Sequence, residues 1–137
     1  MRVVLDTNVV VSALLHPQRL PARVVIAAIQ GRVIPLFDQR ILDEYHDVLS
    51  RSKFRFERDQ VALLLADLES LGESVTIANP APDAPTPDPA DRPFLEVAIA
   101  GRADALVTGN RRHFPDGLGV AILSPAELMN ELEGATR

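Results

Sequence analysis

The sequence contains no cysteine, which excludes disulfides, thiolate catalysis and zinc sites built on cysteine. Its three histidines, His16, His46 and His113, lack the spacing of a zinc-binding helix motif. No apolar run is long enough to cross a membrane, and the three apolar residues after Arg2 are too few for a signal peptide. We therefore expect a cytoplasmic protein with no membrane partner.

Lysine is nearly absent as well, since Lys53 is the only one among 14 basic residues. The formal net charge is −5, which argues against a protein that coats nucleic acid through bulk electrostatics. An enzyme that gathers carboxylates around a cation, with a local basic rim for its substrate, remains compatible with this charge. The 137 residues, 47% of them hydrophobic, predict a single globular domain over residues 1–137.

Apolar segments and capping residues alternate along the chain. Strands are expected at 3–6, 33–37, 105–108 and 120–123, with a short one at 75–77. Helices are expected as a first turn between Asn8 and Ser12, and at 21–30, 39–50, 58–71, 91–100 and 124–133. The proline-rich segment 79–90 predicts an extended surface loop. Strands that alternate with helices indicate an α/β fold with a mainly parallel sheet flanked by helices.

The most informative segment is the apolar run at residues 3–5, which stops abruptly at Asp6. A run without polar alternation predicts a strand buried on both faces. Open α/β sheets bind their ligands beyond the carboxyl ends of such strands. Because an unpaired buried charge is costly, Asp6 needs a cap, a cation or a metal as its partner.

Three more polar side chains are candidates for the same site. Glu44 lies about 100° from the centre of the apolar stripe of its helix, at the edge of the buried face. Asp91 falls in the first turn of the next helix, and Asn110 follows a second buried strand. Taken singly, Glu44 fits a solvated acid, Asp91 a helix cap or first-turn acid, and Asn110 a turn residue. The α/β order favours their convergence with Asp6.

Carboxylates gathered so closely would repel each other and raise one another's pKa. A hard divalent cation with oxygen ligands removes this conflict, and Mg²⁺ or Mn²⁺ is the natural choice. Such a cation can position water, lower the pKa of that water and neutralise charge on a phosphodiester. The acidic set therefore predicts metal-assisted phosphodiester chemistry.

Four segments carry a family resemblance: VVLDTNVVVSALL (3–15), ILDEYHDVLSRSKF (41–54), DPADRPFLEVAIAGRADALVTGNRRHF (88–114) and VAILSPAEL (120–128). In this order they resemble the PIN-domain ribonucleases, especially the PIN-family toxins of prokaryotic type II toxin–antitoxin systems. The LDTN start and the ADxLVTG strand are fairly specific together, although either alone would be weak. The resemblance implies a Rossmann-like, three-layer PIN fold and metal-dependent endonuclease cleavage of RNA.

Carried over residue by residue, the family's metal ligands fall on Asp6, Glu44 and Asp91. The family's fourth acid falls on Asn110, which keeps an oxygen ligand but lacks the negative charge. This departure puts a second metal ion and the catalytic rate in doubt, and Asp116 could substitute further along the loop.

The resemblance also implies roles for neighbouring residues. Thr7, Asn8 and Thr108 would orient the carboxylates or hold water. Apart from the resemblance, Arg111, Arg112 and His113 directly follow Asn110, and this position places them to touch RNA phosphate. The implied reaction is in-line hydrolysis of RNA by a water molecule activated by the cation. The implied partners are RNA, an antitoxin that inserts a basic side chain among the carboxylates, and a second copy in a homodimer.

A second basic segment follows the helix of Glu44. It interleaves cations with two phenylalanines: Arg51, Lys53, Phe54, Arg55, Phe56 and Arg58. Such a pattern suits contact with single-stranded RNA. The alternative is that the cations offset the helix carboxyl end and the rings belong to the core. We favour the core position for Phe54 and Phe56.

Two other function classes compete with the nuclease. In the first, the missing fourth acid marks a degenerate PIN domain that binds RNA or protein without turnover. In the second, Asp6 accepts a phosphoryl group, as strand-end aspartates do in receiver and HAD-type folds. The second ranks lower, because the DTN segment lacks a second aspartate and no lysine follows a late strand.

Overall fold

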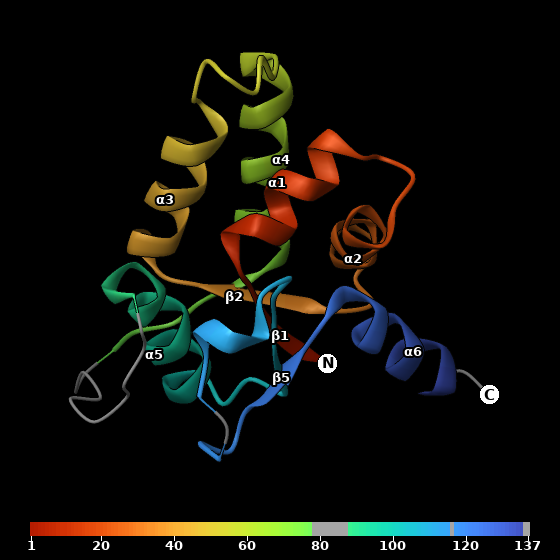
Figure 1. The fold of residues 1–137 in the computed structure, drawn as a ribbon, viewed down its shortest axis with the longest axis vertical. Coiled ribbons are helices and arrows are strands. Elements are labelled where there is room, and N and C mark those ends of the chain that lie inside the picture. The colour runs from red at the N-terminus through yellow and green to blue at the C-terminus, as the bar shows by residue number, and fades with distance from the viewer. Residues whose placement is uncertain (78–87, 116, 136–137) are drawn as a thin grey trace.

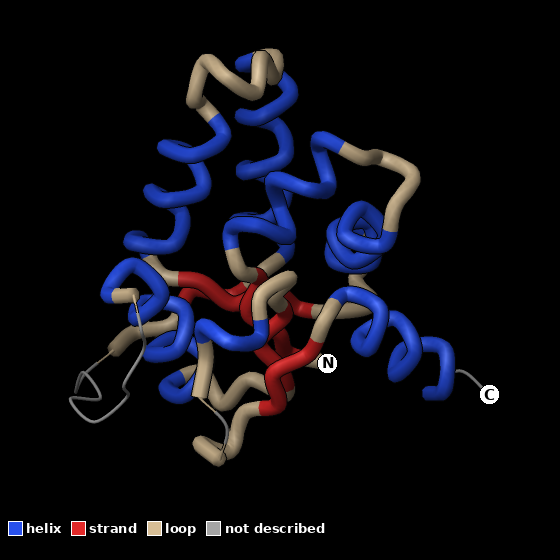
Figure 2. The backbone as a smooth tube through the Cα atoms, viewed as in Figure 1, coloured by secondary structure: helices blue, strands red, loops and turns tan. Residues whose placement is uncertain are grey.

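The computed structural model describes residues 1–77, 88–115 and 117–135 of the chain. Five strands are present in that part: β1 (Arg2–Leu5), β2 (Ile34–Phe37), β3 (Glu73–Ser74), β4 (Ala105–Val107) and β5 (Ala121–Leu123). The helices are α1 (Thr7–Leu15), α2 (Leu20–Ile29), α3 (Gln39–Leu49), α4 (Arg58–Leu71), α5 (Arg92–Ala100) and α6 (Pro125–Ala135). Two short 3₁₀ turns, η1 (Pro89–Asp91) and η2 (Arg111–His113), complete the set (Figure 2).

The strands form one sheet in the order β3-β2-β1-β4-β5, and every neighbouring pair is parallel. Helix α5 packs against β1, β2 and β4, while α1 to α4 lie on the opposite side of the sheet (Figure 1). The protein therefore has the three-layer α/β architecture with a parallel sheet that the sequence predicts.

The central strands β1 and β4 are buried on both faces, as their unbroken apolar sequences predict. Val3, Val4 and Leu106 are all 0% exposed. A strand covered by helices on both sides has no water-facing positions, so polar alternation is absent. The first polar residue after each strand therefore marks the point where the chain leaves the core.

Strand register determines which residues meet at the ends of β1 and β4. Leu5 of β1 pairs with Val107 of β4, so Asp6 and Thr108 leave the sheet side by side. After β1 the chain moves outward to β2 and β3, then returns across the sheet to β4 and β5. The strand order thus reverses between β1 and β4, and ligands of open α/β sheets bind at this switch point.

Two elements differ from the sequence predictions. Helix α1 runs for nine residues instead of a single turn, because Asp6 caps it and its apolar residues pack inward. The short strand lies at Glu73–Ser74 rather than at 75–77. It pairs with β2 directly after Gly72, so the change of direction comes earlier than the apolar pattern indicates. Most of the loop predicted at 79–90 lies outside the described residues.

Within the described ranges, the longest and most apolar helices still fall short of what a membrane crossing requires.

Gly72 allows α4 to turn into β3 close to the neighbouring strand. A Cβ atom at this position would lie 2.3 Å from the Pro35 carbonyl oxygen and 2.6 Å from that of Leu68. Both neighbours are backbone atoms, so neither can move away without shifting its element. Gly134 near the end of α6 is different, because a Cβ atom there meets nothing within 4 Å.

Gly72→Ala is therefore expected to destabilise the protein by about 1–3 kcal/mol, as overpacked sites do. Gly134→Ala is the matched control and should stabilise it by up to about 1 kcal/mol, since alanine is the better helix residue. Urea unfolding followed by circular dichroism measures both. Equal effects of the two substitutions would contradict the close packing at Gly72.

Candidate active site

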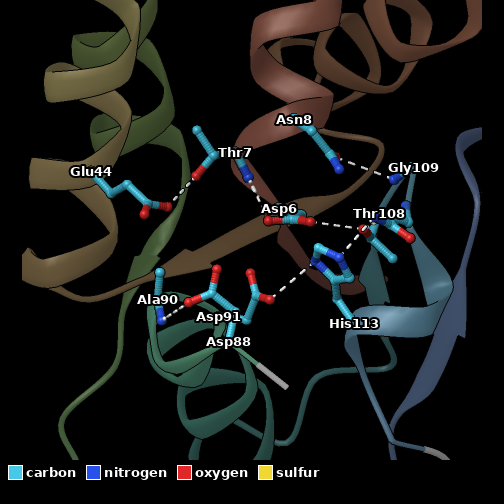
Figure 3. A network of polar contacts seen from close by, with 11 residues as sticks. Asp6, Thr7, Asn8, Glu44, Asp88, Ala90, Asp91, Thr108, Gly109 and His113 are labelled. Carbon is cyan, nitrogen blue, oxygen red and sulfur yellow. Dashed lines mark hydrogen bonds and ion pairs between the residues drawn. The ribbon is translucent and has the colours of Figure 1, made fainter. Parts of the chain in front are cut away.

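Asp6 is held in place by two hydrogen bonds at the junction of β1 and α1. Its Oδ1 accepts from the Thr7 backbone amide at 2.9 Å, and its Oδ2 accepts from Thr108 Oγ1 at 2.7 Å (Figure 3). The residue is only 6% exposed. Burial raises the pKa of Asp6, and the two hydrogen bonds and nearby His113 offset this only in part. The Thr7 amide and the Thr108 hydroxyl are thus the partners that this buried acid requires.

Glu44 reaches the same region from α3, half-buried at the edge of its helix as predicted. Thr7 Oγ1 donates a hydrogen bond to Glu44 Oε2. The same threonine donates its backbone amide to Asp6, so Thr7 fixes both acids. This contact orients a carboxylate, which is the role the family resemblance implies for Thr7.

Asp91 completes the set at the end of η1, where α5 begins. Its Oδ2 is buried and has no hydrogen-bond partner among the described residues. Asp91 occupies the N-cap position of α5, as in the alternative that we set out, but its side chain makes no cap bond to that helix. Burial raises the pKa of Asp91, and the charges of Asp6, Asp88 and Glu44 raise it further, while His113 lowers it.

Asn110 and His113 form the fourth side of the site. The Asn110 backbone amide donates to Thr108 Oγ1 at 2.9 Å, and its Nδ2 lies 2.9 Å from His113 Nε2. His113 Nδ1 in turn lies 3.2 Å from Asp91 Oδ2, at ion-pair distance but without hydrogen-bond geometry. At the position of the family's fourth acid, this chain therefore has an amide–imidazole pair that reaches Asp91.

Asn8 holds the loop after β4 against α1. Its Oδ1 accepts a hydrogen bond from the Gly109 backbone amide at 3.2 Å. Asn8 thus acts on the loop that carries Asn110, and its side chain makes no contact with a carboxylate in the described part of the chain. Asp116, the suggested substitute for the fourth acid, lies outside that part.

Sequence reasoning missed the role of Tyr45, the single tyrosine of the chain. Its buried hydroxyl donates to the Leu5 carbonyl oxygen, which joins α3 to the end of β1. Burial raises the pKa of Tyr45, and the charges of Asp6 and Glu44 raise it further. The phenol therefore stays neutral and adds no charge to the acidic set.

Sequence reasoning also missed an ion pair between the helices that carry Glu44 and Asp91. Glu96 of α5 is 5% exposed, and its Oε1 lies 3.3 Å from Nη1 of Arg40 on α3. Arg40 also contacts Asp38, the cap of α3, at 2.8 Å. Glu96 also lies 4.0 Å from Nε of Arg92 on its own helix, so the buried acid has cations on both sides and the Arg40 contact joins α3 to α5.

The acids fit a divalent cation in chemistry but are not closed around one. Among the described residues, no three acidic or histidine side chains are close enough to hold an ion as they stand. Glu44 and Asp91 nevertheless point toward Asp6 from separate elements (Figure 3). All three offer oxygen atoms, and Asp91 Oδ2 is buried with no hydrogen bond and with His113 Nδ1 at 3.2 Å. A cation would give that oxygen a ligand partner and would offset the burial and the neighbouring charges that raise the pKa of Asp91.

The two arginines predicted to touch RNA differ in their surroundings. Arg111 Nη1 contacts both carboxylate oxygens of Glu127 on α6, at 3.0 and 3.2 Å. Glu127 also forms a reciprocal cap with Ser124 at the start of α6. Arg112 is exposed, and its side chain has no ion pair within the described ranges. Of the two, Arg112 is the cation available to a substrate.

The chain is similar to known proteins both in sequence and in fold. Residues 2–112 match the family model described as "PIN domain". The chain superposes on a solved structure of VapBC2 from Rickettsia felis with a TM-score of 0.61 at 18% identity. In that structure VapBC2 is bound to a DNA fragment from its promoter. The match covers 90% of this chain and 98% of that one, and at this identity it shows the fold. No curated protein matches the sequence.

Thr108→Val tests the hydrogen bonds at the centre of the site. The substitution removes the donor to Asp6 and the acceptor for the Asn110 amide, inside a fully buried position. We expect a loss of about 1–3 kcal/mol in the free energy of unfolding, measured in urea with chelator present. The control is Thr76→Val, an exposed threonine that should change stability by less than about 0.5 kcal/mol. Similar values for both would show that the Thr108 hydroxyl contributes nothing.

Proposed function

Because the chain belongs to the PIN-domain family, we propose that it is a metal-dependent endoribonuclease and the toxin of a toxin–antitoxin system. The observation that carries this proposal is the approach of Glu44 and Asp91 to Asp6 at the switch point of the sheet. Three acids from separate elements have no structural need to face one another, and their charges oppose it. A cation bound among them provides the reason.

Mg²⁺ or Mn²⁺ would be held by Asp6, Glu44 and Asp91, and when bound it supplies the positive charge that activates water and neutralises a phosphodiester. The chain's own part is orientation. Thr7 and Thr108 fix Asp6, and Thr7 also fixes Glu44. No side-chain nucleophile is required, which agrees with the absence of cysteine.

Asn110 contributes to this proposed site as a neutral group. Its side chain contacts His113, which extends to Asp91, so it acts on the third acid through the imidazole. A neutral amide lowers the total negative charge around the site compared with a fourth carboxylate. We therefore propose a site for one cation rather than two.

Substrate and partners follow from the same reasoning. RNA phosphate would meet Arg112 beside the acidic site. The fold shared with VapBC2 supports an antitoxin as partner, and we propose that a basic side chain of that partner enters among the carboxylates. A homodimer and a cytoplasmic location complete the proposal.

The leading alternative is a degenerate PIN domain that binds RNA or protein without turnover. The neutral Asn110 and the incomplete closure of the acids favour it. The phosphoryl-acceptor hypothesis is weaker, because both oxygens of Asp6 already accept hydrogen bonds. An attacking carboxylate would have to give up one of them.

Asp6→Asn separates the nuclease from the binding module. We expect wild-type protein to cleave a mixed RNA pool with Mn²⁺ or Mg²⁺ and to stop when chelator is added. Asp6→Asn should lower cleavage by about 100-fold or more and weaken Mn²⁺ binding in calorimetry. The control is Asp43→Asn, an exposed acid beside Glu44 that bonds Gln39 instead. Metal-dependent cleavage that survives Asp6→Asn would overturn the assignment, and RNA binding without any cleavage would favour the binding module.

Charge reversal at the basic rim tests the substrate contact. Arg112→Glu should weaken RNA binding. It should also reduce, by about one unit, the slope of the logarithm of the binding constant against the logarithm of the salt concentration. Arg111→Glu should also weaken binding but less steeply, since Glu127 already neutralises Arg111. Fluorescence anisotropy at several salt concentrations measures both, with Arg23→Glu on the exposed face of α2 as the control. Binding that is unchanged in both rim variants would place the RNA elsewhere.

A further inference from the structure

A cavity of about 680 Å³ lies between the end of α3 and the start of α4. Its wall combines three arginines, two hydroxyls and an aromatic ring: Arg51, Arg55, Arg58, Ser50, Ser52 and Phe56. Its volume is within the range of cavities that bind small organic ligands. The acidic site already described contributes none of its side chains.

The cavity concentrates positive charge in a chain whose net charge is −5. Only Asp59 among its lining residues is acidic. Arg51 has a weak exposed pair with Asp47, at 3.4 Å. Arg55 and Arg58 have no ion pair among the residues that the structure describes. Arginines that outnumber the carboxylates around them mark a place where an anion is stabilised.

Arg55 adopts a backbone conformation that arginine rarely takes. Its φ is 55°, in the left-handed region that costs a residue with a side chain about 1 kcal/mol or more. The chain accepts this strain directly after a turn in which the Phe54 amide donates to the Arg51 carbonyl oxygen. The turn brings Arg51 and Arg55 to the same cavity. Strain of this kind is typical of binding sites.

The cavity has an aromatic residue in its lining, Phe56, and Phe54 stacks on that ring from outside the lining. Phe54 and Phe56 stack at 5.4 Å between ring centroids, with an interplanar angle of 8°. Phe56 packs against the core and lines the cavity, whereas Phe54 is half-buried and outside the core. The sequence prediction that both rings belong to the core is thus wrong for Phe54. A ring beside a cluster of arginines suits a base attached to a phosphate.

The cavity is distinct from the acidic site although both involve α3. Glu44 faces Thr7 of α1, whereas the last residues of α3 face the start of α4 across the cavity. His46 is the lining residue nearest to Glu44 in sequence, and two residues along a helix turn a side chain by about 200°, away from the face of Glu44. A ligand in this cavity would not need the cation that we propose for the acids.

We propose that this cavity binds a nucleotide through its phosphate and its base. Arg55 and Arg58 contact the phosphate, Ser50 and Ser52 donate hydrogen bonds to it, and Phe56 stacks on the base. A free mononucleotide and one nucleotide of an RNA strand present the same chemistry. The site goes beyond the proposed cleavage reaction, because nothing in it depends on the acids.

Calorimetric titration with AMP tests the proposal. Wild-type protein is compared with the double variant R55Q/R58Q and with the control R23Q/R32Q, which removes the same charge from exposed arginines elsewhere. We expect R55Q/R58Q to weaken AMP binding by about tenfold or more and the control to leave it unchanged. Equal affinities in all three proteins, or no AMP binding at millimolar concentration, would overturn the proposal.

Two further measurements separate the parts of the site. Phe56→Leu keeps an apolar side chain against the core, so it should weaken AMP binding while leaving the binding of inorganic phosphate unchanged. Asp6→Asn should leave AMP binding unchanged, and a loss there would instead place the nucleotide at the acids. A short oligoadenylate that binds more tightly than AMP, and loses this advantage in R55Q/R58Q, identifies an RNA strand as the source. Equal affinity for both identifies the free nucleotide.

Discussion

The structure depends on one constraint, a carboxylate buried where two parallel strands end together. Asp6 is buried directly after the end of β1, and its removal from water raises its pKa. Thr108, at the end of the adjacent strand, and the first amide of α1 provide the hydrogen bonds that make the burial tolerable. Strand pairing and helix capping therefore meet on a single side chain. Any shift of β4 against β1 would take the Thr108 hydroxyl away from this acid and leave it the Thr7 amide alone.

The other acids are held near Asp6 by contacts that do not themselves carry chemistry. Thr7 joins Asp6 to Glu44, Tyr45 fastens α3 to the end of β1, and Arg40 joins α3 to the buried Glu96 of α5. These ties oppose the repulsion that would separate the carboxylates. The hydroxyls of Thr7 and Tyr45 and the ion pair between Arg40 and Glu96 thus hold the elements that carry the acids near one another. These contacts are what place the acids for the cation that we propose.

The sequence was sufficient for what local patterns and strand ends determine. Unbroken apolar runs predicted β1 and β4, and the stripe on α3 correctly placed Glu44 at its edge. The family and the fold were also predicted from the motifs. Contacts between distant side chains were not predictable in this way, because Tyr45 and Glu96 differ from ordinary core residues only in their partners. The length of α1 was underestimated, since tertiary packing rather than propensity sustains an apolar helix.

The hydrogen bond between Thr108 and Asp6 joins residues 102 positions apart. Strand β4 must therefore be synthesised before the donor for that acid exists. A translation product that ends before β4 carries the LDTN segment without the hydroxyl that holds Asp6. The orientation of this carboxylate is thus completed only when β4 docks beside β1.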